Sequence, residues 1–186
     1  MPEPISPLDP AAPPGPVVAA VRFDEVGRHC LRQALRAAAH QHRPAIALHI
    51  LHETARTAGL YRRHDDGDVL RPNLDVAAEL LTGLTAEALA DEPEARGDAL
   101  RQLVVPGLPK QRIIEVARLT HAGLIVIGGR PLTGLDRLLR RDVTGAVLRR
   151  APCPVMVVDA AGNRLDPRHL RPLPPNHTLP PAVETT

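Results

Sequence analysis

The side chains that could do covalent chemistry are few in this chain and form no catalytic set. Ser6 is the only serine and lies in a proline-rich N-terminal stretch, so a Ser-His-Asp triad is not supported. Cys30 falls inside a predicted helix and Cys153 directly precedes an apolar run, and neither shows an evident histidine partner for nucleophilic catalysis. We therefore expect no catalytic residues and a protein that is not an enzyme.

Metal ligands are not grouped in the sequence either. His49 and His52 stand three apart in a predicted strand, which places them on opposite faces of a sheet. The acidic stretch 65–68 is similar to part of a calcium loop, but the glutamate that should close such a loop is absent. We expect no metal site.

Composition excludes several classes of partner. The chain has one Phe, one Tyr and no Trp, so it lacks the stacking platform that single-stranded nucleic acid needs. Its net charge of +2 implies no strong polyanionic partner, and no apolar run is long enough to span a membrane. Two cysteines make no disulfide framework, and the N-terminus does not read as a signal peptide. We expect a cytoplasmic protein that binds neither nucleic acid nor membrane.

Strand-like and helix-like segments alternate along the middle of the chain. Near-continuous apolar runs predict five strands, at residues 16–21, 45–52, 99–105, 123–128 and 154–158. Helical spacing and caps predict helices from Asp24 to Gln41, from Pro72 toward Pro93, from Pro109 onward and from Asp142 to Arg150. Residues 54–71 are expected to form a loop.

This alternation predicts an α/β fold with a five-stranded, parallel, doubly wound sheet of Rossmann-like, nucleotide-binding architecture. Such sheets bind ligands beyond the carboxyl ends of their strands, here at Arg22 and from Gly128 onward. Proline gathers in the two ends of the chain, which lack apolar periodicity. The domain is therefore expected at residues 17–158, between disordered tails at 1–16 and 159–186.

Four stretches resemble the universal stress protein (UspA-type) family. They are VVAAVRFDEVGRHCLRQAL from residue 17, ALHILHE from residue 47, VPGLPKQRIIEVARLTHA from residue 105, and GLIVIGGRPLTGLDRLLRRDVTGAVLRRAPCPVMVV from residue 123. The resemblance implies the strand order 3-2-1-4-5 and a homodimer paired through the fifth strand. Val155, Val157 and Val158 would supply that dimer strand. The resemblance also implies a role in stress response, with a protein partner that the sequence does not name.

ATP-binding members of this family carry G-x2-G-x9-G-[S/T] after the fourth strand and an Asp at the end of the first. This chain keeps the first glycine as Gly128. The second glycine falls on Pro131, the Gly-Ser pair falls on Arg141 and Asp142, and the strand-end Asp falls on Arg22. Three of the four elements of the motif are therefore lost or altered.

These changes disfavour ATP. Pro131 has no N–H to offer a phosphate, and the Asp142 carboxylate would take the helix N-terminal N–H groups that a phosphate uses. We therefore expect no cofactor and a regulator that acts through dimerisation and protein contacts. The alternative is a nucleotide sensor that binds ATP or another nucleotide at the switch point. A weaker reading is a nucleotide hydrolase, for which no general base is placed. If a nucleotide or anion does bind, the candidate residues are Arg22, Gly128, Gly129, Arg130, Arg141, Asp142 and Val143.

Overall fold

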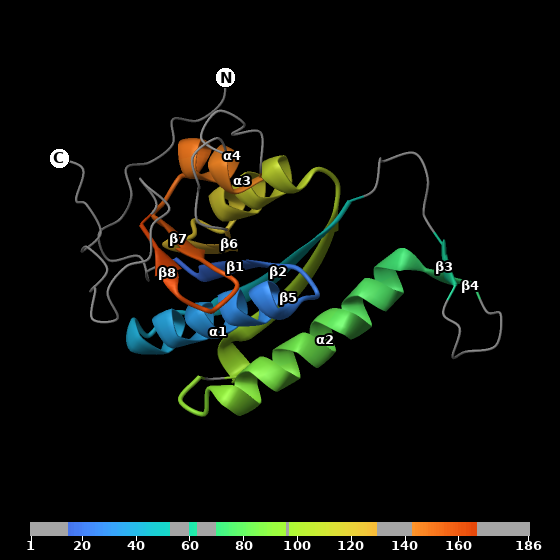
Figure 1. Ribbon diagram of the computed structural model, residues 1–186, viewed down its shortest axis with the longest axis horizontal. Coiled ribbons are helices and arrows are strands. Elements are labelled where there is room, and N and C mark those ends of the chain that lie inside the picture. The colour runs from blue at the N-terminus through green and yellow to red at the C-terminus, as the bar shows by residue number, and fades with distance from the viewer. Residues whose placement is uncertain (1–14, 53–59, 63–69, 96, 130–142, 167–186) are drawn as a thin grey trace, which may run out of the picture.

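A computed structural model describes residues 15–52, 60–62, 70–95, 97–129 and 143–166. In this part of the chain, a twisted sheet lies between two pairs of helices (Figure 1). The elements in chain order are β1 (Val17–Val21), α1 (Glu25–His40), β2 (Ala45–Leu51), β3 (Leu60–Arg62), β4 (Leu70–Pro72), α2 (Asn73–Asp91), the 3₁₀ turn η2 (Gly97–Ala99), β5 (Leu100–Pro106), α3 (Pro109–Leu119), β6 (Leu124–Gly128), α4 (Val143–Arg150), β7 (Val155–Val158) and β8 (Arg164–Leu165).

The strand order of the main sheet is β5-β2-β1-β6-β7-β8. The first five strands of that order are parallel, and they correspond to the predicted order 3-2-1-4-5. β8 adds a sixth strand that runs antiparallel to β7. The predicted α/β fold is thus confirmed, with one strand more than expected.

Burial on both faces explains why the central strands read as continuous apolar runs. Along β1, Val17 and Ala19 pack with α1 and α2, while Val18 packs on the opposite face with α3 and α4. The apolar residues of β6 are likewise buried on both sides. A strand covered on both faces needs an apolar side chain at every position, which is the pattern that predicted it.

Two segments differ from the expected organisation. Residues 54–71 were expected to form a loop, but β3 and β4 pair there as a two-stranded antiparallel sheet. Residues 159–166 were assigned to the C-terminal tail, but they form a turn and β8, so the sheet continues past residue 158. Strands of two or three residues are too short to show a period in sequence. Of the predicted N-terminal tail, only Gly15 and Pro16 are described. Residues 167–186 of the predicted C-terminal tail also lie outside the described residues.

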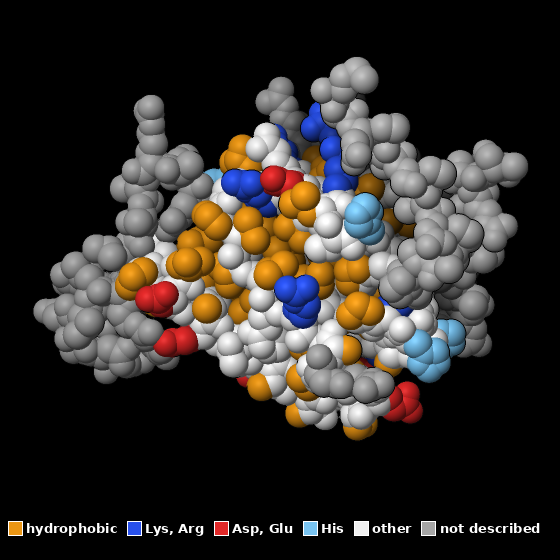
Figure 2. All heavy atoms as spheres, turned by 180° about the vertical axis from the view of Figure 1, so that it is seen from behind, with side chains coloured by type: hydrophobic (Ala, Val, Ile, Leu, Met, Phe, Trp, Pro, Cys, Tyr) orange, Lys and Arg blue, Asp and Glu red, His pale blue; other side chains and the backbone are white. Residues whose placement is uncertain are grey.

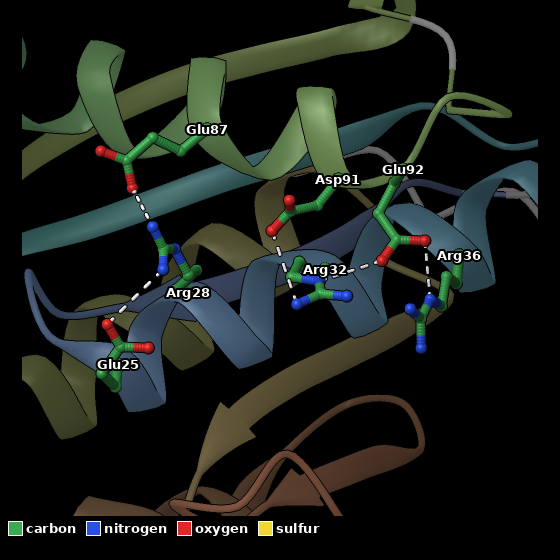
Figure 3. A network of polar contacts seen from close by, with 7 residues as sticks. All are labelled: Glu25, Arg28, Arg32, Arg36, Glu87, Asp91 and Glu92. Carbon is green, nitrogen blue, oxygen red and sulfur yellow. Dashed lines mark hydrogen bonds and ion pairs between the residues drawn. The ribbon is translucent and has the colours of Figure 1, made fainter.

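Ion pairs join α1 to the end of α2 (Figure 3). Arg28, Arg32 and Arg36 follow one another at four-residue spacing, which places them on one face of α1. Arg28 pairs with Glu87 at 2.6 Å, and Arg32 pairs with Asp91 at 3.5 Å. The carboxylate that ends this row is Glu92.

Glu92 is the most buried member of the row, at 8 % exposure. Its two carboxylate oxygens accept hydrogen bonds from Arg32 Nε at 3.0 Å and Arg36 Nε at 2.6 Å. Burial alone would raise the pKa of Glu92, but the hydrogen bonds from Arg36 and Arg32 and the positive charges of both side chains together lower it. The ionised carboxylate therefore stabilises the packing of α1 on α2.

We expect Glu92→Gln to lower the free energy of unfolding by about 2 kcal/mol at neutral pH, because hydrogen bonds to a charged group are lost. Since the folded state lowers the pKa of Glu92, this contribution is present above the ordinary glutamate pKa and is lost as pH falls through the folded value. Urea unfolding at a series of pH values measures it. Glu94→Gln, at an exposed position two residues along, is the control. Equal losses for both variants would contradict the assignment.

Candidate functional site

The carboxyl ends of β1 and β6 meet at one edge of the sheet. Ala20 pairs with Ile127, so the segment that begins at Arg22 and the segment that begins at Gly128 leave the sheet side by side. α1 starts from the first segment, and α4 starts beyond the second. The structure therefore places Arg22, Gly128 and Gly129 at the predicted switch point.

Gly128 and Gly129 occupy positions that have no room for a side chain. A Cβ at Gly128 would lie 2.5 Å from Val26 Cγ1 of α1, and a Cβ at Gly129 would lie 2.4 Å from Val157 Cγ1 of β7. The backbone also holds this turn, because Gly129 N donates to the Val158 carbonyl at 2.9 Å. These glycines serve close packing of α1 and β7 on the strand end, whether or not a ligand binds.

The start of α4 is fixed by a residue that the sequence did not single out. Thr144 Oγ1 donates to the Gly128 carbonyl at 2.7 Å, and Val143, the first residue of α4, is half-buried. A hydroxyl at the second residue of a helix carries no signal of its own in sequence. Arg130, Pro131, Arg141 and Asp142 lie outside the described residues, so the predicted competition between Asp142 and a phosphate stays a prediction.

Arg22 is paired with a carboxylate of its own segment. Arg22 Nε donates to Asp24 Oδ2 at 2.9 Å, and a terminal nitrogen of the guanidinium contacts the same oxygen. Asp24 Oδ1 accepts from Gly27 N at 2.9 Å and so caps α1, as its position predicted. Burial raises the pKa of Asp24, but the hydrogen bonds from Gly27 and Arg22 together lower it. Both carboxylate oxygens are therefore engaged within the β1–α1 turn.

Two rings stack at the ends of β1 and β2. The centroids of Phe23 and His49 lie 4.0 Å apart with an interplanar angle of 25°. His49 Nδ1 donates to the Val21 carbonyl at 3.0 Å. Burial lowers the pKa of His49 more than this hydrogen bond raises it, which favours the neutral ring. The prediction that His49 is structural agrees with this placement, while its contact with Phe23 was not foreseen.

A groove of about 770 Å³ opens beside this stack, between the first turns of α1 and the face of α2. Its apolar wall includes Val76, Leu80 and Leu84 of α2. The charged residues that line it are four acids and one base: Asp24, Glu25, Glu79, Glu87 and Arg28. The groove is therefore negative, and it repels anions rather than attracting them.

The predicted dimer strand coincides with β7, whose outer edge is partly occupied. Val157 and Val158 pair with Leu165 and Arg164 of β8, and their side chains are fully buried in the single chain. Val155 is half-buried, and the register with β8 does not reach it. Dimerisation itself stays a prediction, since one chain is described.

The other reactive groups of the described chain show no arrangement for chemistry. Burial raises the pKa of the Cys30 thiol to about 12 and that of the Cys153 thiol to about 11, so neither is a thiolate at neutral pH. In the ranges that the structure describes, no three His, Cys, Asp or Glu residues gather as metal ligands. No helix in those ranges is long and apolar enough to cross a bilayer.

Comparison with known proteins gives one consistent result. The family model described as "Universal stress protein family" matches residues 15–159. Two universal stress proteins of Methanocaldococcus jannaschii are 36% identical over 87 residues and 30% identical over 86 residues. These matches cover 45% and 43% of this chain, and they span about half of each relative, 51% and 53%.

Solved structures with the same fold come from several sources. A universal stress protein in complex with cAMP gives a TM-score of 0.59 at 20% identity, over 78% of this chain and 97% of that one. A family protein from Burkholderia pseudomallei gives 0.50 at 22% identity, over 80% and 98% of the two chains. An Arabidopsis thaliana family protein with AMP bound gives 0.50 at 18%, over 83% and 99%. At these identities the likeness shows the fold.

We expect Asp24→Ala to lower the free energy of unfolding by about 1 kcal/mol, because α1 loses its cap. Asp24→Asn keeps an oxygen for the Gly27 N–H but loses the charge that pairs with Arg22, so it should cost less. Thermal unfolding of both variants measures the difference. An alanine variant as stable as the wild type would contradict the role of Asp24 as the cap of α1.

We expect Gly128→Ala to destabilise the fold by about 1–3 kcal/mol, because its Cβ would overlap Val26. Gly83→Ala in α2 is the matched control, since nothing lies within 4 Å of a Cβ there. Alanine favours a helix over glycine, so the control should gain about 0.5–1 kcal/mol. Urea unfolding separates the two, and changes of the same sign would contradict the packing described for Gly128.

Proposed function

This chain belongs to the universal stress protein family, and from that membership we propose that it is a non-enzymatic stress-response regulator that acts through protein contacts and does not bind ATP. We place it in the cytoplasm, since its two cysteines are free and Cys30 is buried. Dimerisation through β7 is part of the same proposal, on condition that the outer edge of that strand is open.

The observation that carries the proposal is the Arg22–Asp24 pair at the end of β1. ATP-binding members, by the resemblance, have an aspartate where Arg22 stands, and its carboxylate binds the ribose. Here that position carries a guanidinium whose side chain is 76% exposed and paired. The nearby Asp24 does not replace the lost carboxylate, because its two oxygens bind Gly27 and Arg22. A ribose hydroxyl would have to displace one of these contacts.

The groove between α1 and α2, which Gly128 and Gly129 do not line, offers a polyphosphate no alternative site. Four carboxylates and one guanidinium line it, so a triphosphate placed there would meet net repulsion. Arg28, the one base in the lining, already pairs with Glu25 at 3.5 Å and Glu87 at 2.6 Å. This base is therefore not free to neutralise a phosphate without breaking the link between α1 and α2.

Exposed apolar surface supports protein contacts. Hydrophobic side chains gather near the centre of the face that is turned away in Figure 1 (Figure 2). Among the exposed large hydrophobic residues, Leu108 directly precedes α3 and Leu119 is its last residue, at 42% and 75% exposure. Apolar patches on the surface of a folded domain are typical of interaction sites.

A second candidate is a nucleotide sensor at the same strand ends. It is favoured by the relatives of the same fold that were solved with cAMP and with AMP. A nucleoside monophosphate carries less charge than ATP, and its binding would depend less on the altered loop. Gly128 and Gly129 keep the backbone of that edge compact in either case.

We expect titration of the full chain with Mg-ATP in a calorimeter to show no binding tighter than about 1 mM. The combined variant Arg22→Asp, Pro131→Gly, Arg141→Gly and Asp142→Ser restores the family pattern, and it should bind ATP at least tenfold more tightly. The matched control carries the last three changes with Arg118→Asp in place of Arg22→Asp. Arg118 is an exposed residue of α3, so the net charge is equal while the strand end is unchanged.

Micromolar affinity of the wild type for ATP would overturn the proposal. Parallel titrations with cAMP and AMP test the second candidate, and micromolar binding of either by the wild type would favour it over the first. If the control gains as much ATP affinity as the restored variant, then Arg22 is not what excludes the ribose.

A further inference from the structure

We propose that residues 159–165, named here the edge-closing segment, occupy the outer edge of β7 and block strand-to-strand pairing with a second copy of this chain. A dimer through β7 then forms only when this segment leaves the edge. The proposal concerns assembly and does not depend on whether a nucleotide binds.

The backbone groups of β7 alternate between its two neighbours. Ile125 N donates to the Pro154 carbonyl at 3.0 Å, and Gly129 N donates to the Val158 carbonyl at 2.9 Å. Residues 154 and 158 therefore face β6, and by the alternation of a strand the residues 155, 157 and 159 face outward. Asp159 N indeed donates away from β6, to the Asn163 carbonyl at 2.9 Å.

The edge-closing segment uses these outward groups. Val157 pairs with Leu165, and Asp159 bonds to Asn163, so two of the three outward positions of the edge are taken. Val155 is the remaining position, and within the described residues β8 does not extend far enough to pair with it. One outward residue is too little for a second strand to add to the sheet, because a strand pair needs several successive bonds.

The turn that begins this segment is organised by the Asp159 side chain, which is 8% exposed. Asp159 Oδ1 accepts from Ala161 N at 2.9 Å and from Asn163 N at 2.8 Å. Asp159 Oδ2 accepts from Asn163 Nδ2 at 3.3 Å. Gly162 has φ +82°, which glycine adopts without strain.

The segment is also held against α1 and the core. Gln33 Nε2 donates to the Gly162 carbonyl at 3.2 Å, and Arg164 Nε donates to Gln33 Oε1 at 3.3 Å. Leu165 is 1% exposed and packs in the cluster that contains Val147 and Val157. The contacts are numerous but local, so a single substitution at the turn or at Leu165 should free the segment from the edge.

A very short edge strand such as β8 protects a sheet from pairing with other chains. β7 without its cover would present apolar residues and outward N–H and C=O groups to a second copy. A twofold axis could then join two β7 strands antiparallel. The edge-closing segment therefore decides whether this surface is available, and the described chain has it closed.

Sedimentation equilibrium of the full chain over a wide concentration range tests the proposal. We expect a monomer for the wild type. Asp159→Ala removes the acceptor of the turn, and Leu165→Asp places a charge in the apolar cluster. Each should tighten dimerisation at least tenfold. Adding Val155→Pro to either variant should return it to a monomer, since Val155 N–H faces outward and its loss leaves the pairing with β6 intact.

Leu119→Asp is the matched control, the same change at a leucine that is 75% exposed on α3, and it should leave the monomer unchanged. Circular dichroism checks that each variant is folded. If Leu165→Asp does not fold, Asp159→Ala alone tests the proposal. A wild-type dimer that Val155→Pro dissociates would overturn the proposal. Variants that stay monomeric although hydrogen exchange shows the Val157 amide unprotected would also overturn it. Variants whose dimers persist after Val155→Pro is added would overturn it as well.

Discussion

Two-sided burial of a parallel sheet is the constraint on which the rest of this structure depends. Because β1 and β6 are neighbours and run in the same direction, their carboxyl ends must open at one edge of the sheet. Helices have to start from both ends and pack closely enough to cover the strands. Gly128 and Gly129 meet this demand by letting α1 and β7 approach the backbone. The backbone shape of the site is therefore set by the packing of helices and strands and does not depend on a ligand.

Charge at this edge is balanced by the chain itself. Arg22 pairs with Asp24, Arg28 pairs with Glu25 and Glu87, and the groove beside them is lined mainly by carboxylates. A surface that satisfies its own charges offers little to a polyphosphate, because each new contact must first break an existing one. The altered glycine motif and the paired guanidinium therefore point the same way, toward protein contacts rather than ATP.

The sequence predicted what depends on repetition and local chemistry. Five apolar runs indicated the five parallel strands, and Asp24 was identified as the cap of α1. It could not predict contacts between distant segments. The row from Arg28 to Glu92 shows in sequence only as separate charges on α1 and near the end of α2. The Phe23–His49 stack joins a residue that follows β1 to a residue of β2. β8 was missed because two residues carry no period, although Asp159 and Gly162 are ordinary turn residues.

Native mass spectrometry of the purified full chain tests the central claim most directly, because it reports ligand and stoichiometry in one spectrum. The account predicts a single species at the 20.0 kDa mass of one chain, with no added mass. A population heavier by the mass of an adenine nucleotide would contradict the claim that this edge satisfies itself. A population at twice the chain mass that the Val155→Pro variant loses would contradict the closed edge of β7.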